Sequence, residues 1–210
     1  MGSQLVRTAP APIATPDRDT PQHIQSAFVF GSLGDCKAFL FNPTKKLTRD
    51  LTQDNRGLSL SPTDCGGRLG PYVDGSQPDL RNFMLHFQEC EEGDLLLIVS
   101  DGVHDNLDPQ QLGLSPKDLA LPQNDWSEMD ADVSELHRCR YRERRLNDLI
   151  LSVGEPYEPQ HVVPVILKHC LDTNHAAAEW MKANVGKRLP FDYSKYPGKM
   201  DHTSCLCFRV

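Results

Sequence analysis

The amino-acid sequence predicts an α+β fold in which helices pack against a mostly antiparallel sheet. Three observations indicate this fold. Runs of β-prone residues occur early, midway and last in the chain, two helical patterns lie between the last two of these runs, and no segment is repeated. This order is typical of α+β domains rather than of repeated βαβ units. The 210 residues are enough for one domain with a substantial core.

The first two predicted strands flank a tight turn. They span residues 27–30 and 37–41, and the stretch between them contains Ser-Leu-Gly-Asp at residues 32–35. Two β-prone runs so closely spaced predict a hairpin with Asp35 at or near its turn. Residues 42–82 are polar and rich in glycine, so we expect them to form loops.

Three further strands are predicted in the rest of the chain. Residues 83–87 alternate large apolar side chains with others, and residues 95–99 read Leu-Leu-Leu-Ile-Val without interruption. A continuous apolar run of this length, preceded by a turn, favours a strand that is buried. The last strand, residues 203–210, is indicated by its alternating pattern.

Two helices are predicted between the last two strands. Residues 134–153 combine helix-forming residues with spaced apolar positions, and residues 160–185 do the same. Pro164 is compatible with the second helix if it lies in the first turn. Residues 108–133 are polar and interrupted by prolines, so we expect an insertion with short helical turns.

Composition and charge argue against several classes of protein. The formal net charge of −7 does not suit a general nucleic-acid binder, and no apolar run approaches the roughly 18 to 20 residues that span a bilayer. The seven cysteines form no Cys-x-x-Cys pair, which favours reduced thiols in an intracellular protein. Residues 1–25 read as a flexible leader without a secretory signal, and residues 26–210 as the domain. We expect a cytoplasmic location, with the nucleus as the alternative, and neither nucleic acid nor membrane as a partner.

Four aspartates share one kind of local context. Asp35 lies at the predicted turn, Asp101 directly follows the buried strand, Asp105 lies one helical turn further on, and Asp201 precedes the last strand. If these strands are neighbours, the carboxylates converge, and carboxylates without basic partners repel one another unless a divalent cation lies between them. Hard oxygen ligands favour Mg²⁺ or Mn²⁺. The alternative is that each aspartate caps a turn or a strand end.

Three segments, in the same order along the chain, resemble the second half of a protein phosphatase 2C domain. They are FVFGSLGDCKAFLF, GDLLLIVSDGVHDNL and KMDHTSCLCFRV. The motifs GDCK, SDGVHD and DHTS take the places of the family's Gly-Asp-Ser-Arg, Ser-Asp-Gly-x-x-Asp and Asp-Asn-x-Thr. The resemblance covers residues 27–210 outside the expected insertion.

This resemblance implies a fold, a site and a chemistry. The fold is a sandwich of two antiparallel sheets flanked by helices, with its N-terminal part missing here. Asp101 and Asp201 match ligands of the family's catalytic metal pair, and Asp35 and Asp105 match residues that help to bind an additional ion. The family hydrolyses phosphoserine and phosphothreonine in protein substrates with water activated by Mg²⁺ or Mn²⁺.

The chain also departs from the family pattern. The Asp-Gly-His-Gly-Gly segment, whose aspartate bridges the two metals, is not found, and Lys37 and His202 stand in place of the family's arginine and asparagine. Two hypotheses follow. The chain is a truncated or incomplete form of a metal-dependent Ser/Thr phosphatase that is inactive on its own, or it is a non-catalytic pseudophosphatase or scaffold that binds protein partners.

A basic run offers one candidate surface for such a partner. Arginines occupy five of the eight positions from Arg138 to Arg145, within the first predicted helix. They form either a docking patch for an acidic protein partner or a solvated helix face balanced by Glu135 and Glu143. We prefer the second interpretation.

Overall fold

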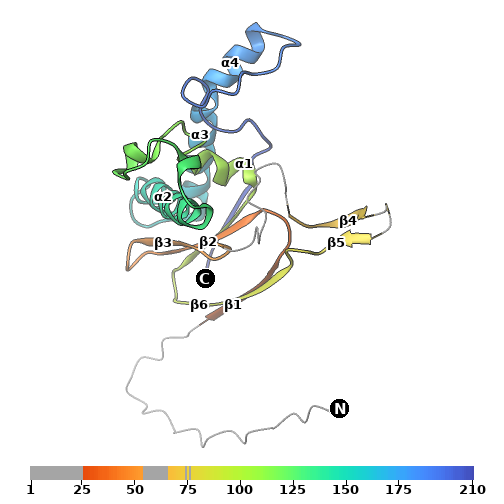
Figure 1. Ribbon diagram of the computed structural model, residues 1–210. Helices are drawn as coiled ribbons and strands as arrows, with labels where there is room; N and C mark the ends of the chain where they lie inside the picture. Colours follow the sequence, from red (N-terminus) through yellow and green to blue (C-terminus); the bar gives the residue numbers. More distant parts are fainter. Residues whose placement is uncertain (1–25, 54–65, 74, 76) are drawn as a thin grey trace, which may run out of the picture.

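The computed structural model describes residues 26–53, 66–73, 75 and 77–210. Its centre is an antiparallel sheet of four strands in the order β3-β2-β7-β8, with helices packed on one face (Figure 1). The strands are β2 (Lys37–Asn42), β3 (Leu47–Asp50), β7 (Leu95–Val99) and β8 (Cys205–Arg209). The predicted combination of helices with antiparallel sheets is therefore confirmed.

The two middle strands of this sheet are buried because both of their faces are covered. Phe39 and Leu97 point to the helical side and pack with apolar residues of two helices, while Leu40 and Leu96 point to the other side. Successive side chains of a strand alternate between faces, so both faces need apolar residues when both are covered. This explains why residues 95–99, which were predicted to form a buried strand, are apolar without interruption.

A second, two-stranded sheet covers the other face. Strand β1 (Ser26–Ser32) pairs antiparallel with β6 (Met84–Cys90), from Ser26 opposite Cys90 to Ser32 opposite Met84. Phe28 of β1 packs against the cluster of Leu40 and Leu96, and its ring lies 5.8 Å from that of Phe208 in β8. The two sheets therefore meet face to face, as the resemblance implied.

The predicted hairpin between the first two strands is wrong. Strand β1 belongs to the two-stranded sheet, whereas β2 pairs with β3 on one edge and β7 on the other. Both edges of β2 are thus taken, which leaves no edge for β1. The turn at Gly34, where φ is +89°, instead carries the chain from one sheet to the other.

Residues 42–82 also contain more regular structure than expected. Besides β3 they hold β4 (Arg68–Val73) and β5 (Gln77–Asp79), which pair with each other and project from the body of the molecule (Figure 1). Strand β3 is short and largely polar, as is β5, so neither gives the apolar pattern on which strand prediction depends.

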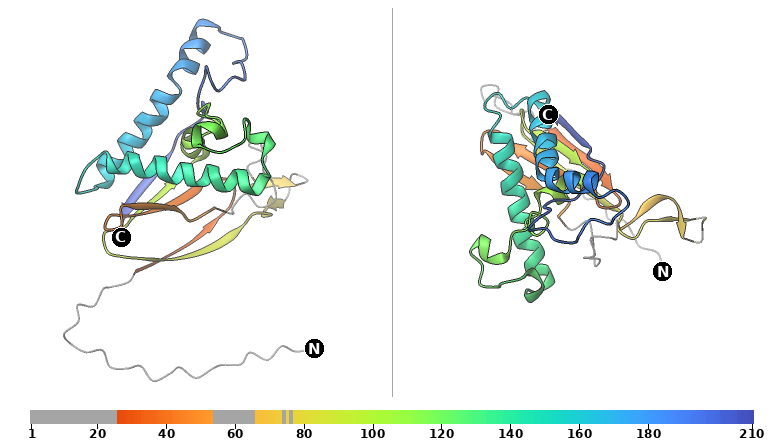
Figure 2. Two further views of the ribbon diagram at one scale, coloured as in Figure 1. Left: turned by 60° about the vertical axis from the view of Figure 1, so that its left-hand side comes forward. Right: turned by 90° about the horizontal axis from the view of Figure 1, so that it is seen from above.

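Helices α2 (Ala131–Leu151) and α3 (Pro159–Thr173) cover one face of the central sheet, and α4 (His175–Ala183) lies at the far end of α3 (Figure 2). The predicted second helix is thus two helices. The break falls at Asn174, whose side chain donates to the carbonyl of Cys170 and so ends α3. Pro164 lies inside α3 beyond its first turn, because the helix begins at Pro159.

Short helical turns lie between β7 and α2. Those in residues 108–133, where they were expected, are η2 (Pro116–Leu119) and η3 (Trp126–Glu128). Two more, α1 (Asp101–His104) and η1 (Asp105–Leu107), come before that segment and were not expected. Within the described part of the chain, no helix is both long and apolar enough to cross a membrane. The expected leader, residues 1–25, lies outside the described residues.

Candidate functional site

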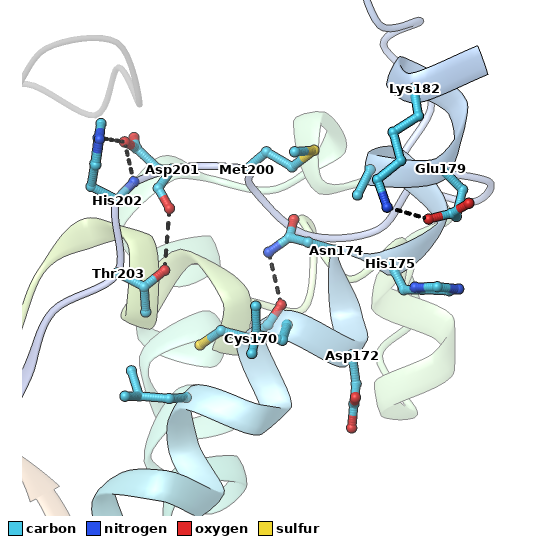
Figure 3. A pocket seen from close by; sticks show the side chains of 13 residues that line it. Cys170, Asp172, Asn174, His175, Glu179, Lys182, Met200, Asp201, His202 and Thr203 are labelled. Atoms are coloured by element: carbon cyan, nitrogen blue, oxygen red, sulfur yellow. Dashed lines mark hydrogen bonds and ion pairs between the residues drawn. The ribbon is translucent and has the colours of Figure 1, made fainter.

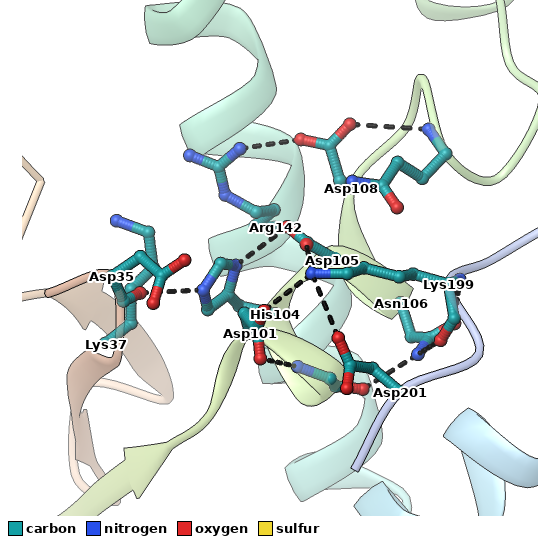
Figure 4. A network of polar contacts seen from close by, with 12 residues as sticks. Asp35, Lys37, Asp101, His104, Asp105, Asn106, Asp108, Arg142, Lys199 and Asp201 are labelled. Carbon is teal, nitrogen blue, oxygen red and sulfur yellow. Dashed lines mark hydrogen bonds and ion pairs between the residues drawn. The ribbon is translucent and has the colours of Figure 1, made fainter. Parts of the chain in front are cut away.

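The candidate site forms where β7 ends and β8 begins. These strands are antiparallel neighbours, with Val99 opposite Cys205, so the residues after β7 and before β8 meet at one edge of the sheet. Asp101 and Asp105 follow β7 in α1 and η1, and Asp201 precedes β8. The structure therefore brings together three of the four aspartates around one point (Figure 4).

A lysine side chain of the same segment occupies that point. The Nζ atom of Lys199 lies 2.6 Å from Oδ2 of Asp101, 3.1 Å from Oδ2 of Asp105 and 3.3 Å from Oδ2 of Asp201 (Figure 4). We call these four residues the Lys199 cluster. It is partly buried, since the side chain of Lys199 is 28% exposed and that of Asp105 only 6%.

The electrostatics of the Lys199 cluster favour its charged form. Burial alone lowers the pKa of Lys199, but the hydrogen bonds and charges of Asp101 and Asp105 outweigh it and raise the pKa above its usual range. The backbone N–H of His202, which donates to Asp201, and the ammonium of Lys199 together lower the pKa of Asp201. The cluster thus favours the ammonium form of Lys199 and the carboxylate form of Asp201.

Asp35 is placed through its main chain. Its carbonyl oxygen accepts a hydrogen bond from Nε2 of His104, 2.9 Å away, and Nδ1 of the same ring lies 3.1 Å from Oδ1 of Asp105. His104 is 2% exposed and so forms a buried link between the turn after β1 and the Lys199 cluster. The sequence-predicted residue Asp35 therefore adjoins the cluster by way of His104.

Asn106 fixes the backbone of Lys199. Its Nδ2 donates to the carbonyls of Gly102 and Lys199, at 2.8 and 3.0 Å, and its Oδ1 accepts from the backbone N–H of Lys199 at 3.0 Å. Asn106 is fully buried. Because the N–H and the carbonyl of Lys199 are both hydrogen-bonded, its Cα is fixed beside Asp101 and Asp105.

Close contact between α1 and the segment before β8 requires glycine. A Cβ atom at Gly102 would lie 2.3 Å from the carbonyl oxygen of His202, and one at Gly198 would lie 2.3 Å from Oδ1 of Asn106. Gly198 also has a φ of +87°, which favours glycine. These two glycines allow the two halves of the Lys199 cluster to approach each other.

The Lys199 cluster does not fit a divalent cation while the lysine remains in place. Carboxylate oxygens are suitable ligands for Mg²⁺ or Mn²⁺. However, the point where the three carboxylates meet holds an ammonium group, and a metal ion there would lie against a second positive charge. In the described ranges, no group of three or more His, Cys, Asp or Glu side chains has the arrangement of a metal site.

Two functional residues were not singled out from the sequence. Lys199 is two positions from Asp201, in the segment KMDH. The sequence does not show that its side chain points toward the aspartates. Asn106 follows Asp105 directly and gave no signal, since a buried asparagine cannot be told from an exposed one by sequence alone. A metal site was expected for carboxylates without basic partners, and Lys199 is such a partner.

A groove opens beside the Lys199 cluster. It has a volume of about 790 Å³ and lies between α3, α4 and the segment before β8 (Figure 3). Asp201 and Met200 line it from the segment before β8, Leu171 from α3 and Glu179 from α4. Of the cluster, only Asp201 is part of its wall.

The arginine run of α2 is only partly available to a partner. Arg142 is buried, with Nη1 2.7 Å from Oδ2 of Asp108, and Nη2 of Arg138 lies 2.9 Å from the same oxygen. Burial alone raises the pKa of Asp108, but these two arginines outweigh it and lower the pKa. Arg138 and Arg142 therefore anchor the chain after η1, while Arg140 and Arg144 are exposed.

The two facing sheets and the carboxylates at the junction of β7 and β8 agree with the resemblance to the protein phosphatase 2C family. No family model matches the chain. Over 80 residues the chain is 35% identical to a PP2C-like domain-containing protein of Drosophila melanogaster, a match that covers 37% of this chain and 11% of the relative. This sequence match confirms the resemblance to the protein phosphatase 2C family, for part of its domain.

Solved structures were also compared with the chain. The phosphatase domain of the cell fate determinant SpoIIE from Bacillus subtilis aligns with a TM-score of 0.40 in a form presoaked with manganese and 0.38 in another form, each at 10% identity. The first alignment covers 89% of this chain and 51% of the bacterial domain. The chain thus spans about a tenth of the length of the curated relative and about half of that solved domain.

Proposed function

We propose that this chain is a non-catalytic, PP2C-like binding module, a pseudophosphatase that has kept carboxylates of the metal site without the metal. One observation carries the proposal. The ammonium of Lys199 lies within 3.3 Å of three carboxylates, two of which, Asp101 and Asp201, match metal ligands by resemblance.

An ammonium cannot replace the chemistry that a metal pair supplies. Divalent ions in such sites lower the pKa of bound water and polarise the phosphoryl oxygens. Lys199 donates to Asp101 and Asp105 and lies 3.3 Å from Asp201, so carboxylates of the chain itself, and not a substrate, hold its ammonium. Three carboxylates and one ammonium also leave the Lys199 cluster negative, which disfavours the approach of a phosphate dianion.

A metal-dependent phosphoprotein phosphatase is the second candidate. It is favoured by the convergence of Asp101, Asp105 and Asp201 from two separate segments on one point, because Mg²⁺ and Mn²⁺ sites need oxygen ligands gathered in this way. Under this alternative, Lys199 swings away and residues outside this chain supply the missing ligands. The whole protein would then be the enzyme, and this chain one side of its site.

Hydrolysis of a phosphothreonine peptide in Mn²⁺ or Mg²⁺ separates the two candidates. The chain is compared with Asp101→Asn and with Asp148→Asn, which changes an exposed aspartate of α2. We expect all three folded proteins to show the same rate as buffer. Hydrolysis by the chain and by Asp148→Asn that is lost in Asp101→Asn would overturn the proposal in favour of the phosphatase.

We also propose an acidic segment of a cytoplasmic protein as the partner, bound on the outer face of α2. This is supported by the exposure of Arg140 and Arg144, which lie four positions apart on one helix face. Binding of a polyglutamate peptide, followed at several salt concentrations, tests the proposal. Reversal of both charges should abolish binding, and an unchanged affinity would rule out this face.

A further inference from the structure

The negative charge of Asp101, Asp105 and Asp201 is offset in part by a cation that belongs to the chain itself, the ammonium of Lys199. We infer that Lys199 is a resident cation: it takes the structural place of a bound divalent ion, holding Asp101, Asp105 and Asp201 together and keeping Mg²⁺ and Mn²⁺ out. The inference rests on the proposed function, because it treats these carboxylates as counterparts of metal ligands.

The ammonium of Lys199 is surrounded by carboxylates. Its Nζ atom donates hydrogen bonds to Asp101 at 2.6 Å and to Asp105 at 3.1 Å, and it forms an ion pair with Oδ2 of Asp201 at 3.3 Å. Distances at the short end of this range are typical of charge-assisted hydrogen bonds. The three acids come from both sides of the junction of β7 and β8, so the lysine joins segments about a hundred residues apart in sequence.

Lys199 also differs from the surface lysines of this chain. Lys182 and Lys168 each pair with one carboxylate, and their side chains are 73% and 72% exposed, against 28% for Lys199. Exposed pairs of that kind contribute little to stability. The backbone of Lys199 is held at both its N–H and its carbonyl by the buried Asn106, which removes much of the freedom that a surface lysine has.

Loss of the ammonium leaves three carboxylates facing one another. Their repulsion destabilises the fold, and the remaining oxygens form the kind of ligand set that Mg²⁺ and Mn²⁺ prefer. A chain without this charge should therefore depend on a divalent ion for stability, whereas the natural chain should not. A lysine that only fills space would give no such dependence on metal.

Thermal unfolding in EDTA and in Mn²⁺ tests the inference. We expect the natural chain to melt at the same temperature in both buffers. Lys199→Met should melt lower in EDTA, by on the order of 5 °C for a domain of this size, and should recover in Mn²⁺.

Adding Asp101→Asn to Lys199→Met should restore part of the stability in EDTA and remove the response to Mn²⁺. Lys182→Met is the matched control and should resemble the natural chain in both buffers.

Lys199→Arg keeps the charge and is the second variant. It should melt at a temperature close to that of the natural chain, with no change on addition of Mn²⁺. If Lys199→Met is unfolded in both buffers, this result for Lys199→Arg tests the inference. A fall in Lys199→Arg as large as that in Lys199→Met would overturn the inference, as would stabilisation of the natural chain by Mn²⁺.

The failure of this inference is distinguishable from that of the proposed function. If Lys199→Met is folded and does not respond to Mn²⁺, and the natural chain does not hydrolyse phosphopeptide, the inference fails and the non-catalytic function stands. Hydrolysis by the natural chain in Mn²⁺ that depends on Asp101 would instead overturn the proposed function.

Discussion

Asn106 is the residue on which the position of Lys199 depends. It is fully buried, and its amide bonds the backbone of Lys199 at two points and the carbonyl of Gly102 at a third. A side chain that bridges two segments through its own donors and acceptor can be replaced only by one with the same groups in the same place. The aspartates hold the ammonium of Lys199, and Asn106 fixes the position of its backbone.

Replacing Asn106 with alanine should be costly. The change removes a buried bond to the carbonyl of Gly102 and two part-buried bonds to the backbone of Lys199, so we expect a loss of about 2 to 4 kcal/mol in the free energy of unfolding. Urea denaturation measures it. Asn184→Ala, at the partly exposed end of α4, removes one bond to a carbonyl and serves as the control. A loss below about 1 kcal/mol for Asn106→Ala would contradict this role.

Gly102 gives a second prediction at this scale. The methyl group in Gly102→Ala would lie 2.3 Å from the carbonyl oxygen of His202. Both atoms are attached directly to the backbone, so no side-chain rotation relieves the contact. We expect a loss of roughly 1 to 3 kcal/mol, as is usual for overpacking. Gly70→Ala is the control, since a Cβ there has nothing within 4 Å. Equal melting temperatures for the two variants would show that the contact at Gly102 is relieved by movement.

At the level of elements, α2 is attached to the chain after η1 through Asp108. This carboxylate is buried against Arg138 and Arg142, and Glu135 also contacts Arg142. Two arginines that looked like part of an exposed basic run are therefore structural. The charge pattern of α2 did not reveal this, because Asp108 is distant in sequence and reaches the helix only in the folded chain.

Asp108→Asn should destabilise the protein at neutral pH by about 3 to 5 kcal/mol, because it leaves a buried arginine without its main partner. The folded pKa of Asp108 is lowered, so the stability it contributes is present above the unfolded value of about 3.9 and is lost as pH falls through the folded pKa. Denaturation at pH 7 and below pH 4 should show the difference between the two proteins shrinking in acid. Asp148→Asn, which alters an exposed aspartate of α2, is the control. A difference that is constant with pH would contradict the ion pairs.

The elements that were predictable are those with strong apolar patterns. Residues 95–99 match β7 at both ends, because four of the five side chains are buried and the whole run is apolar. The pairing of β1 was not predictable, since local sequence favoured a hairpin while the buried β2 already had two partners. Similarly, nothing in residues 160–185 marked Asn174 as the break, because its side-chain partners lie in α3 and in the distant η1.

At the level of the whole molecule, the outer face of the two-stranded sheet is apolar and exposed. Val29 and Phe87 lie opposite each other and are both 66% exposed, and Leu85 is 74% exposed. Exposed apolar groups that adjoin in this way promote association. We expect Phe87→Lys to reduce binding of a hydrophobic dye with little change in melting temperature. A large fall in melting temperature would show that this face is buried in solution.

The convergence of the aspartates was also predictable at this level, but its meaning was not. The order of the motifs placed Asp101 and Asp201 at adjoining strand ends, and the pairing of β7 with β8 brings them together. The segment from α4 to β8 has no regular secondary structure, so its path could not be predicted from the sequence. Lys199 lies in this segment. A site that looked like a metal centre from its acids therefore contains its own cation.

The most direct test of this account is a titration of the natural chain with Mn²⁺, followed by the electron paramagnetic resonance signal of the free ion. The account predicts that the chain and Asp101→Asn bind equally little Mn²⁺, while Lys199→Met gains a site that Asp101→Asn removes. Binding of Mn²⁺ to the natural chain that is lost in Asp101→Asn would contradict it, because the metal would then displace Lys199 from the carboxylates.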